Sequence, residues 1–286
     1  MKKVFLLGNP RSGTSLLRIM LNSHPKIVSP PECGFLHWWY AKYKDWDKKK
    51  SSSQEKVEYF VEDVLQSKKI ETWNLEQESL VKAILDRTPS NYAQLCLIVY
   101  LEYARIRKSE PEVIVDKNNY YIHHLDVLEK IWPDALYIHL IRDGRDVACS
   151  YLDVKELNST SPYKPKLSTN ISEIAQEWNL NNLHIERFVN RRPVEERIKV
   201  RYEDLVSEPE DSLKNLCKLL EIPFSSKMLN YFLYNDEPRS TSDWKLKTFK
   251  KPDKQNIGRY KNKLTESEIS QFNIVAEESL KRSGYL

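Results

Sequence analysis

The chain has 286 residues, of which 40% are hydrophobic and 11% aromatic, enough to bury a core without disulfides or structural metals and too many for intrinsic disorder. Its 45 Lys and Arg residues nearly balance its 41 Asp and Glu residues, which excludes a broadly basic nucleic-acid binder but allows a local anion site. For the same reason we expect no nucleic-acid partner. Because no apolar run approaches the roughly 18 residues of a membrane span, we expect a cytoplasmic protein with no membrane span.

Predicted strands alternate with predicted helices along the chain. Residues 2–7 have the pattern of a buried strand, residues 8–13 form a turn, and apolar residues then recur at helical spacing from Leu16 to Leu21. This alternation predicts an α/β fold, a parallel sheet flanked by helices, in a single domain over residues 1–286. The further predicted strands are Val113–Val115, Leu136–Ile141 and Arg197–Val200, the helices are Gln54–Gln66, Ser90–Arg107, Tyr120–Ile131, Ile171–Val189 and Pro209–Leu220, and the surface loops are Lys48–Ser53 and Ser159–Ser168.

The first loop has the spacing of a phosphate-binding loop. Residues 8–15, GNPRSGTS, match G-x-x-x-x-G-K-[ST], except that Thr14 stands where the lysine should be. Between a strand and a helix, such a loop points backbone N–H groups and the positive helix end at an anion. We therefore predict a phosphate site, in a protein that is not an ordinary ATPase. Its candidate residues are Arg11, Ser12, Gly13, Thr14 and Ser15.

A second strand end carries a similar pattern. Arg142 follows a predicted strand, Gly144 breaks it, and Ser150 lies within the second turn of the next predicted helix. Ligands of open α/β sheets bind at the carboxyl ends of strands, and the planar fork of arginine suits a phosphate dianion. We predict that Arg142 and Ser150 bind a second phosphate group.

Cysteine and histidine spacing gives no reason to expect a metal. The cysteines lack the close pairs of zinc and redox motifs, so buried free thiols are expected, and we assign no metal site. The cysteines are Cys33, Cys96, Cys149 and Cys217.

Together, the two loops resemble the sulfotransferases that use 3′-phosphoadenosine 5′-phosphosulfate (PAPS). Residues 10–15 look like the family's 5′-phosphosulfate loop, and Arg142 with Ser150 looks like its 3′-phosphate motif. The resemblance implies a P-loop-type α/β fold, a sulfotransferase activity, and PAPS as donor without a metal. The other substrate would be a hydroxyl-bearing acceptor such as a tyrosine, a sugar or a small molecule, and the enzyme would be a possible homodimer.

The similarity is closest to the tyrosylprotein sulfotransferase branch and its bacterial relatives. Glu32 falls at that branch's catalytic glutamate, Lys117 resembles its catalytic lysine, and Tyr202 resembles the adenosine-side tyrosine. Residues 257–265 resemble the segment that closes over the donor. Residues 36 to 112 carry no match. The donor-contacting serine and lysine near the C-terminus have several candidates, Ser240 or Ser242 with Lys251 or Lys254.

These residues divide into the roles that sulfuryl transfer needs. Glu32 would accept the acceptor proton, while Lys117 and Arg11 would stabilise the departing phosphate oxygen. Thr14 and Ser15 would hold the phosphosulfate with the loop N–H groups.

Two other functions remain open at this point. Residues 113–116 also look like a strand that ends in a magnesium-binding aspartate, Asp116, which favours a P-loop kinase as the alternative enzyme. The third hypothesis is a nucleotide-binding scaffold without catalysis.

Overall fold

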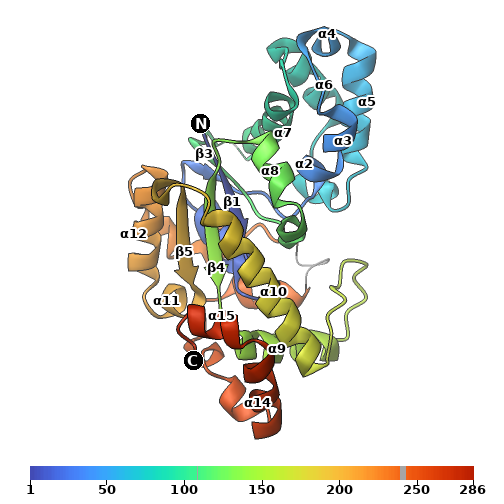
Figure 1. The fold of residues 1–286 in the computed structure, drawn as a ribbon. Helices are drawn as coiled ribbons and strands as arrows, with labels where there is room; N and C mark the ends of the chain where they lie inside the picture. The colour runs from blue at the N-terminus through green and yellow to red at the C-terminus, as the bar shows by residue number, and fades with distance from the viewer. Residues whose placement is uncertain (108, 239–242) are drawn as a thin grey trace. The chain divides into compact units, whose positions relative to one another are not determined.

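A computed structural model describes residues 1–107, 109–238 and 243–286 and has a five-stranded sheet with strand order β2-β3-β1-β4-β5 (Figure 1). β1 and β2 both pair in parallel with β3, with Lys2 and Ile27 opposite Val113, and β4 pairs in parallel with β5, with Tyr137 opposite Arg197. The predicted α/β fold with a parallel sheet flanked by helices is confirmed. The strands are β1 (Lys2–Leu7), β2 (Ile27–Val28), β3 (Val113–Asp116), β4 (Leu136–Ile141) and β5 (Arg197–Arg201).

The chain forms two compact units, and β1 contributes to both. The first unit comprises residues 1–5 and 24–136, and the second comprises residues 6–23 and 137–286. The expectation of a single domain stays a prediction.

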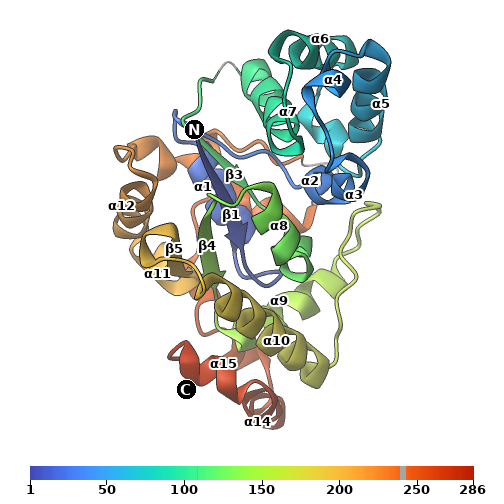
Figure 2. The same cartoon turned by 45° about the horizontal axis from the view of Figure 1, so that its top comes forward.

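The first unit adds a group of helices after β2. Among them α5 packs against α6, and α6 packs against α7, as Figure 2 shows. The predicted loop at 48–53 is wrong, because Asp47 caps a short helix there by accepting a hydrogen bond from the backbone N–H of Lys50 at 2.8 Å. These elements are α2 (Phe35–Trp38), α3 (Tyr40–Tyr43), α4 (Lys48–Ser51), α5 (Gln54–Leu65), η1 (Ile70–Trp73), α6 (Gln77–Arg87) and α7 (Tyr92–Ile106).

The helix predicted over residues 120–131 is in fact two shorter elements, η2 (Asn119–His123) and α8 (Leu125–Ile131). His124 separates them because its φ of −139° is not helical. The side chain of Asn118 caps η2 by accepting a hydrogen bond from the backbone N–H of Tyr120 at 3.1 Å.

Helices of the second unit surround the ends of β4 and β5. α14 and α15 pack against α10 (Figure 1). The ring centroids of Trp178 on α10 and Phe272 on α14 lie 6.0 Å apart. The predicted loop at 159–168 has no helix or strand. The α-helices are α1 (Thr14–Asn22), α9 (Gly144–Glu156), α10 (Ile171–Val189), α11 (Tyr202–Ser207), α12 (Pro209–Leu220), α13 (Tyr260–Lys263), α14 (Glu266–Val275) and α15 (Glu277–Arg282). Short 3₁₀ turns are η3 (Val194–Glu196), η4 (Ser226–Met228), η5 (Tyr231–Leu233), η6 (Asp243–Phe249) and η7 (Lys254–Asn256).

All four cysteines are buried free thiols, as expected. In the part of the chain that the structure describes, we find no helix with the length and apolar character needed to cross a membrane.

A buried carboxylate ends β3. Oδ2 of Asp116 accepts hydrogen bonds from the hydroxyl groups of Tyr100 at 2.7 Å and Tyr121 at 2.6 Å, and the aspartate is 3% exposed. Burial raises the pKa of Asp116 to about 6, although both tyrosine hydrogen bonds oppose this shift. The two hydroxyls connect the end of β3 to α7 and η2.

The raised pKa predicts a pH-dependent stability. Because the folded state binds this proton more tightly than the unfolded state, the contribution of Asp116 is fully present below its ordinary pKa of 3.8 and is lost as pH rises through about 6. A shift of this size corresponds to about 3 kcal/mol. In Asp116→Asn, urea unfolding between pH 4 and 7 should lack this fall in the free energy of unfolding. The exposed Asp86→Asn should keep it, and identical profiles for the two variants would contradict the assignment.

Candidate functional site

The first loop is held in place by buried polar contacts within the second unit. The side chain of Asn9 accepts a hydrogen bond from Asn181 Nδ2 at 2.7 Å and donates to the hydroxyl of Tyr151 at 3.3 Å. A Cβ atom at Gly8 would lie 2.5 Å from the carbonyl oxygen of Leu140, so only glycine lets the loop approach the end of β4 this closely. The loop therefore has a fixed conformation on α9 and α10.

Arg11 joins the two motifs that the sequence identified separately. Its backbone is left-handed, with φ of 67°. Its Nε donates a hydrogen bond to Ser150 Oγ at 3.1 Å, and its Nη2 donates to the carbonyl oxygen of Trp244 at 3.2 Å. The predicted 5′-phosphosulfate loop and the predicted 3′-phosphate motif thus form one cluster.

Arg142 lies at the centre of this cluster. Its guanidinium donates hydrogen bonds to the carbonyl oxygens of Arg11 at 3.3 Å and Asn256 at 2.7 Å, and it lies 4.4 Å from the centroid of the Tyr202 ring. Its Nε is buried and has no hydrogen-bond partner among the described residues. A buried N–H donor without a partner is costly, so this atom is suited to a ligand oxygen.

The start of α1 has no side-chain cap. Gly13 occupies the N-cap with φ of 100°, and the first turn of the helix begins at Thr14. The hydroxyl of Ser12 is buried without a hydrogen-bond partner in the described part of the chain. Ser15, the last residue predicted for this site, lies in the same turn of α1. This arrangement fits a phosphate or sulfate group.

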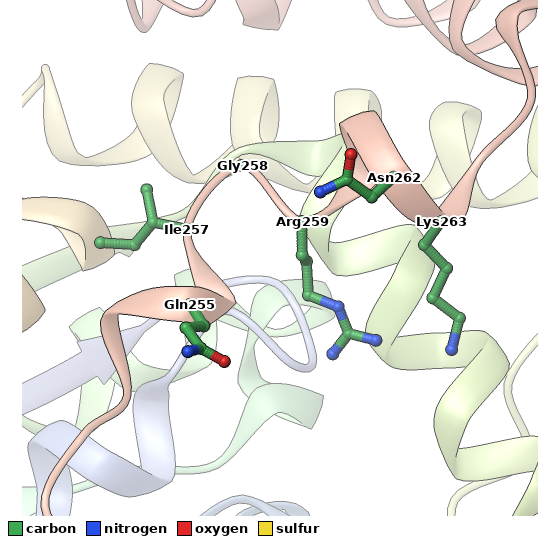
Figure 3. A pocket seen from close by; sticks show the side chains of 6 residues that line it. All are labelled: Gln255, Ile257, Gly258, Arg259, Asn262 and Lys263. Carbon is green, nitrogen blue, oxygen red and sulfur yellow. The ribbon is translucent and has the colours of Figure 1, made fainter.

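The C-terminal segment is tied to the start of α9. Asp146 accepts hydrogen bonds from the backbone N–H groups of Gly258 at 2.7 Å and Tyr260 at 3.0 Å. Next to this anchor lies a pocket of about 760 Å³, and Figure 3 shows the side chains of Arg259 and Lys263 extending from the same side of the segment. Its lining residues are Gln255, Ile257, Gly258, Arg259, Asn262 and Lys263.

Lys247 is a candidate donor-binding residue that sequence reasoning missed. Partial desolvation, and then the positive charges of Arg259, Arg11 and Arg142, lower the pKa of this lysine, so these cations lie near one another. The predicted candidates Lys251 and Lys254 are exposed, as is Lys247. Lys254 lies in η7, immediately before the pocket, but does not line it. Ser240 and Ser242 lie outside the described residues.

A buried ion cluster in the second unit was also missed. Arg18 on α1 is fully buried and donates hydrogen bonds to Asp236 at 2.8 Å and Glu237 at 3.0 Å, and Lys245 pairs with Glu237 at 2.9 Å. Each charge is paired, which offsets its desolvation. The cluster fixes the segment around Lys245 to the phosphate-loop helix. An amphipathic reading of α1 places Arg18 at a surface and gives no signal for this role.

The predicted base and its lysine meet in the first unit. Lys117, which directly follows β3 and is 1% exposed, donates a hydrogen bond to Glu32 Oε1. Lys69 donates a second to Glu32 Oε2 at 3.1 Å. Glu32 is therefore not a solvated surface carboxylate, although it lies in a loop. Lys69 falls in the stretch for which the sequence offered no match.

The second unit thus has the arrangement of a P-loop-type phosphate-binding protein in which Arg11 and Arg142 supply positive charge and Thr14 stands where most such loops have a lysine. The model of the sulfotransferase family matches residues 3–226, and the chain belongs to that family. The predicted family is confirmed, and the alternative of a kinase is not favoured.

Comparisons with individual proteins agree with this family. Over 237 residues the chain is 25% identical to protein-tyrosine sulfotransferase 1 of Danio rerio, covering 81% of this chain and 56% of that protein. The human protein-tyrosine sulfotransferase 1 is 26% identical over 238 residues, with 81% and 54% coverage. The chain spans about half the length of these curated relatives. The sulfotransferase domain of the Synechococcus PCC 7002 olefin synthase shares the fold, with a TM-score of 0.61, 24% identity, and 96% and 94% coverage.

Gly13 is predicted to be indispensable for this geometry. A Cβ atom there would lie 2.5 Å from the Tyr202 ring, in addition to the strain of a positive φ. Gly13→Ala should therefore lower the free energy of unfolding by about 2 to 4 kcal/mol, as overpacking and backbone strain combine. Gly258→Ala is the matched control, because its φ of 70° is also positive but nothing lies within 4 Å of the added atom. Equal losses in urea unfolding would show that the Tyr202 contact is unimportant.

Proposed function

We propose that this protein transfers a sulfuryl group from PAPS to a hydroxyl acceptor. The observation that carries the proposal is the contact between the two loops, in which Arg11 bonds Ser150 and Arg142 bonds Arg11. An ordinary nucleotide needs one phosphate-binding loop, whereas a second cluster of arginine and hydroxyl groups suits the additional 3′-phosphate of PAPS. Family membership supports the same activity.

The described residues fit this donor. The buried Ser12 hydroxyl and the first turn of α1, with Thr14 and Ser15, would hold the phosphosulfate, and Arg142 with Ser150 would hold the 3′-phosphate. When bound, PAPS supplies the activated sulfuryl group. A mouse sulfotransferase of similar fold, with a TM-score of 0.51 and 12% identity, was solved in complex with PAP, the desulfonated product 3′-phosphoadenosine 5′-phosphate.

In this proposal the acid–base chemistry and the charge stabilisation come from Glu32 and Lys117 of the first unit and Arg11 of the second unit. The Glu32 carboxylate takes the proton of the acceptor hydroxyl, which makes the acceptor oxygen a stronger nucleophile. Lys117 and Arg11 place positive charge where the departing phosphate oxygen gains negative charge. Their ammonium and guanidinium groups take the part that Mg²⁺ takes in kinases, so no divalent metal is needed.

This chemistry specifies an acceptor that carries a hydroxyl group. The relatives are named for protein tyrosine, which makes a tyrosine one candidate, beside a sugar or a small molecule. A cytoplasmic location and a homodimer are further parts of this proposal.

The first test is donor selectivity. The chain should bind PAP far more tightly than ADP in calorimetry, because Arg142 and Ser150 have a ligand only when the 3′-phosphate is present. Arg142→Ala should weaken PAP binding by roughly 1.5 to 3 kcal/mol, the range for a charged hydrogen bond, and should leave ADP binding nearly unchanged. Arg187→Ala, on the exposed face of α10, is the charge-matched control. Equal affinity for PAP and ADP would rule out the proposed donor.

The second test concerns the base. Glu32→Gln keeps the shape of the side chain and removes the carboxylate, so turnover should fall by about 10²- to 10⁴-fold while PAP affinity stays within a few-fold. Glu55→Gln on the exposed face of α5 is the control. Near-normal turnover of Glu32→Gln would move the base elsewhere, with His37 or His123 as the next candidates. Of these, burial and the neighbouring His124 lower the pKa of His37 to about 4.

A further inference from the structure

Both oxygens of the Glu32 carboxylate are held by lysines. Lys117 Nζ contacts Oε1, and Lys69 Nζ lies 3.1 Å from Oε2. The side chain of Lys117 is 1% exposed, that of Glu32 is 13% exposed, and that of Lys69 is 27% exposed. The three groups are thus sheltered enough for their charges to interact more strongly than at an open surface.

The backbone around Lys69 is anchored to the loop that carries Glu32. The indole N–H of Trp73 donates to the carbonyl oxygen of Pro31 at 2.9 Å, and the Trp73 ring packs edge-on against Phe35 with centroids 5.6 Å apart. On the other side, the indole N–H of Trp39 donates to Ser67 Oγ at 2.8 Å. Residues 67–73, which we call the clamp segment, are therefore fixed to residues 31–39 at both ends.

Lys69 itself has a strained backbone within this clamp segment. Its φ of 73° lies in the left-handed region, which a lysine enters at a cost. The anchors on both sides hold it there, and the result is that its side chain reaches Glu32. A strained residue that contacts a reacting group is typical of functional sites.

We propose that Lys69 is a positioning residue that fixes the orientation of the Glu32 carboxylate and keeps it ionised, ready to accept the acceptor proton. This inference rests on the proposed sulfotransferase function. Lys117 is needed for the departing oxygen in that function, so Lys69 is the partner that remains with the base throughout. The helical region between β2 and β3, in which the sequence analysis identified no motif, thereby gains a role in catalysis.

The other charged groups near Glu32 in the first unit oppose the two lysines. Asp116 at the end of β3 interacts unfavourably with Glu32, and Glu71 from η1 adds negative charge near Cys33, beside Glu32. Loss of Lys69 would therefore leave Glu32 near these carboxylates without one of its two lysine contacts. Protonation of Glu32 would then occur at higher pH.

The test is the pH dependence of the full-length protein and of Lys69→Met. The acidic limb of kcat/KM, at which the base becomes protonated, should move up by about one pH unit in Lys69→Met, the low end of the effect of one close opposite charge. PAP affinity should be unchanged in calorimetry. Methionine has a similar length and pays the same cost at positive φ, so the clamp segment should keep its conformation. The acidic limb of kcat/KM in Lys69→Arg should lie at the same pH as in wild type. The same is expected of the control Lys82→Met, on the exposed face of α6.

A second measurement separates this inference from the proposed function. The carboxyl carbon of Glu32, assigned by its absence in Glu32→Gln, can be titrated by ¹³C NMR without any acceptor. A higher titration midpoint in Lys69→Met supports the contact even in a protein that transfers no sulfuryl group, in which case only the proposed function fails. If the midpoint and the acidic limb both coincide with those of wild type, the role of Lys69 is overturned.

Discussion

The guanidinium of Arg142 is the group on which the donor side of the molecule depends. From the end of β4 it bonds the carbonyl oxygens of Arg11 in the first loop and Asn256 in the C-terminal segment, and it stacks on the ring of Tyr202. Four segments that are far apart in the sequence thus meet at one planar cation. The rigid fork of arginine allows this, whereas a lysine would offer a single point charge.

The same arrangement places positive charge around the first loop, which lacks the lysine usual in P-loops. Positive charge gathers around the loop from Arg11, Arg142, Arg259 and Lys247. Desolvation is the largest cause of the lowered pKa of Lys247, and repulsion by the three arginines lowers it further. Bringing like charges together is unfavourable unless an anion joins them. The fold holds them in place through neutral and anionic anchors, above all Asp146, which binds the C-terminal segment to α9.

In the first unit, the chemistry depends on a carboxylate between two lysines. Lys117 is placed by β3, whose last residue, Asp116, is fixed by two tyrosine hydroxyls. Lys69 is placed by the clamp segment through hydrogen bonds from Trp73 and Trp39. A strand and a helical region with no sequence motif thereby hold one carboxylate, the proposed base. The proposed donor-binding residues of the second unit and the proposed base of the first unit are thus supported by separate networks of contacts.

The sequence by itself determined the two strand–loop–helix motifs, because glycine spacing and apolar periodicity act over a few residues. The resemblance to sulfotransferases gave Glu32, Lys117 and Tyr202 as candidate site residues. Only the tertiary structure revealed Lys69 beside Glu32, 37 residues away, and Arg18 beside Asp236, 218 residues away. Lys247 likewise joins the arginines only after the C-terminal segment has packed on α9. Nothing in a local pattern indicates such contacts, since a charged residue on a helix or loop has the same sequence signal whether it is solvated or buried against a distant partner.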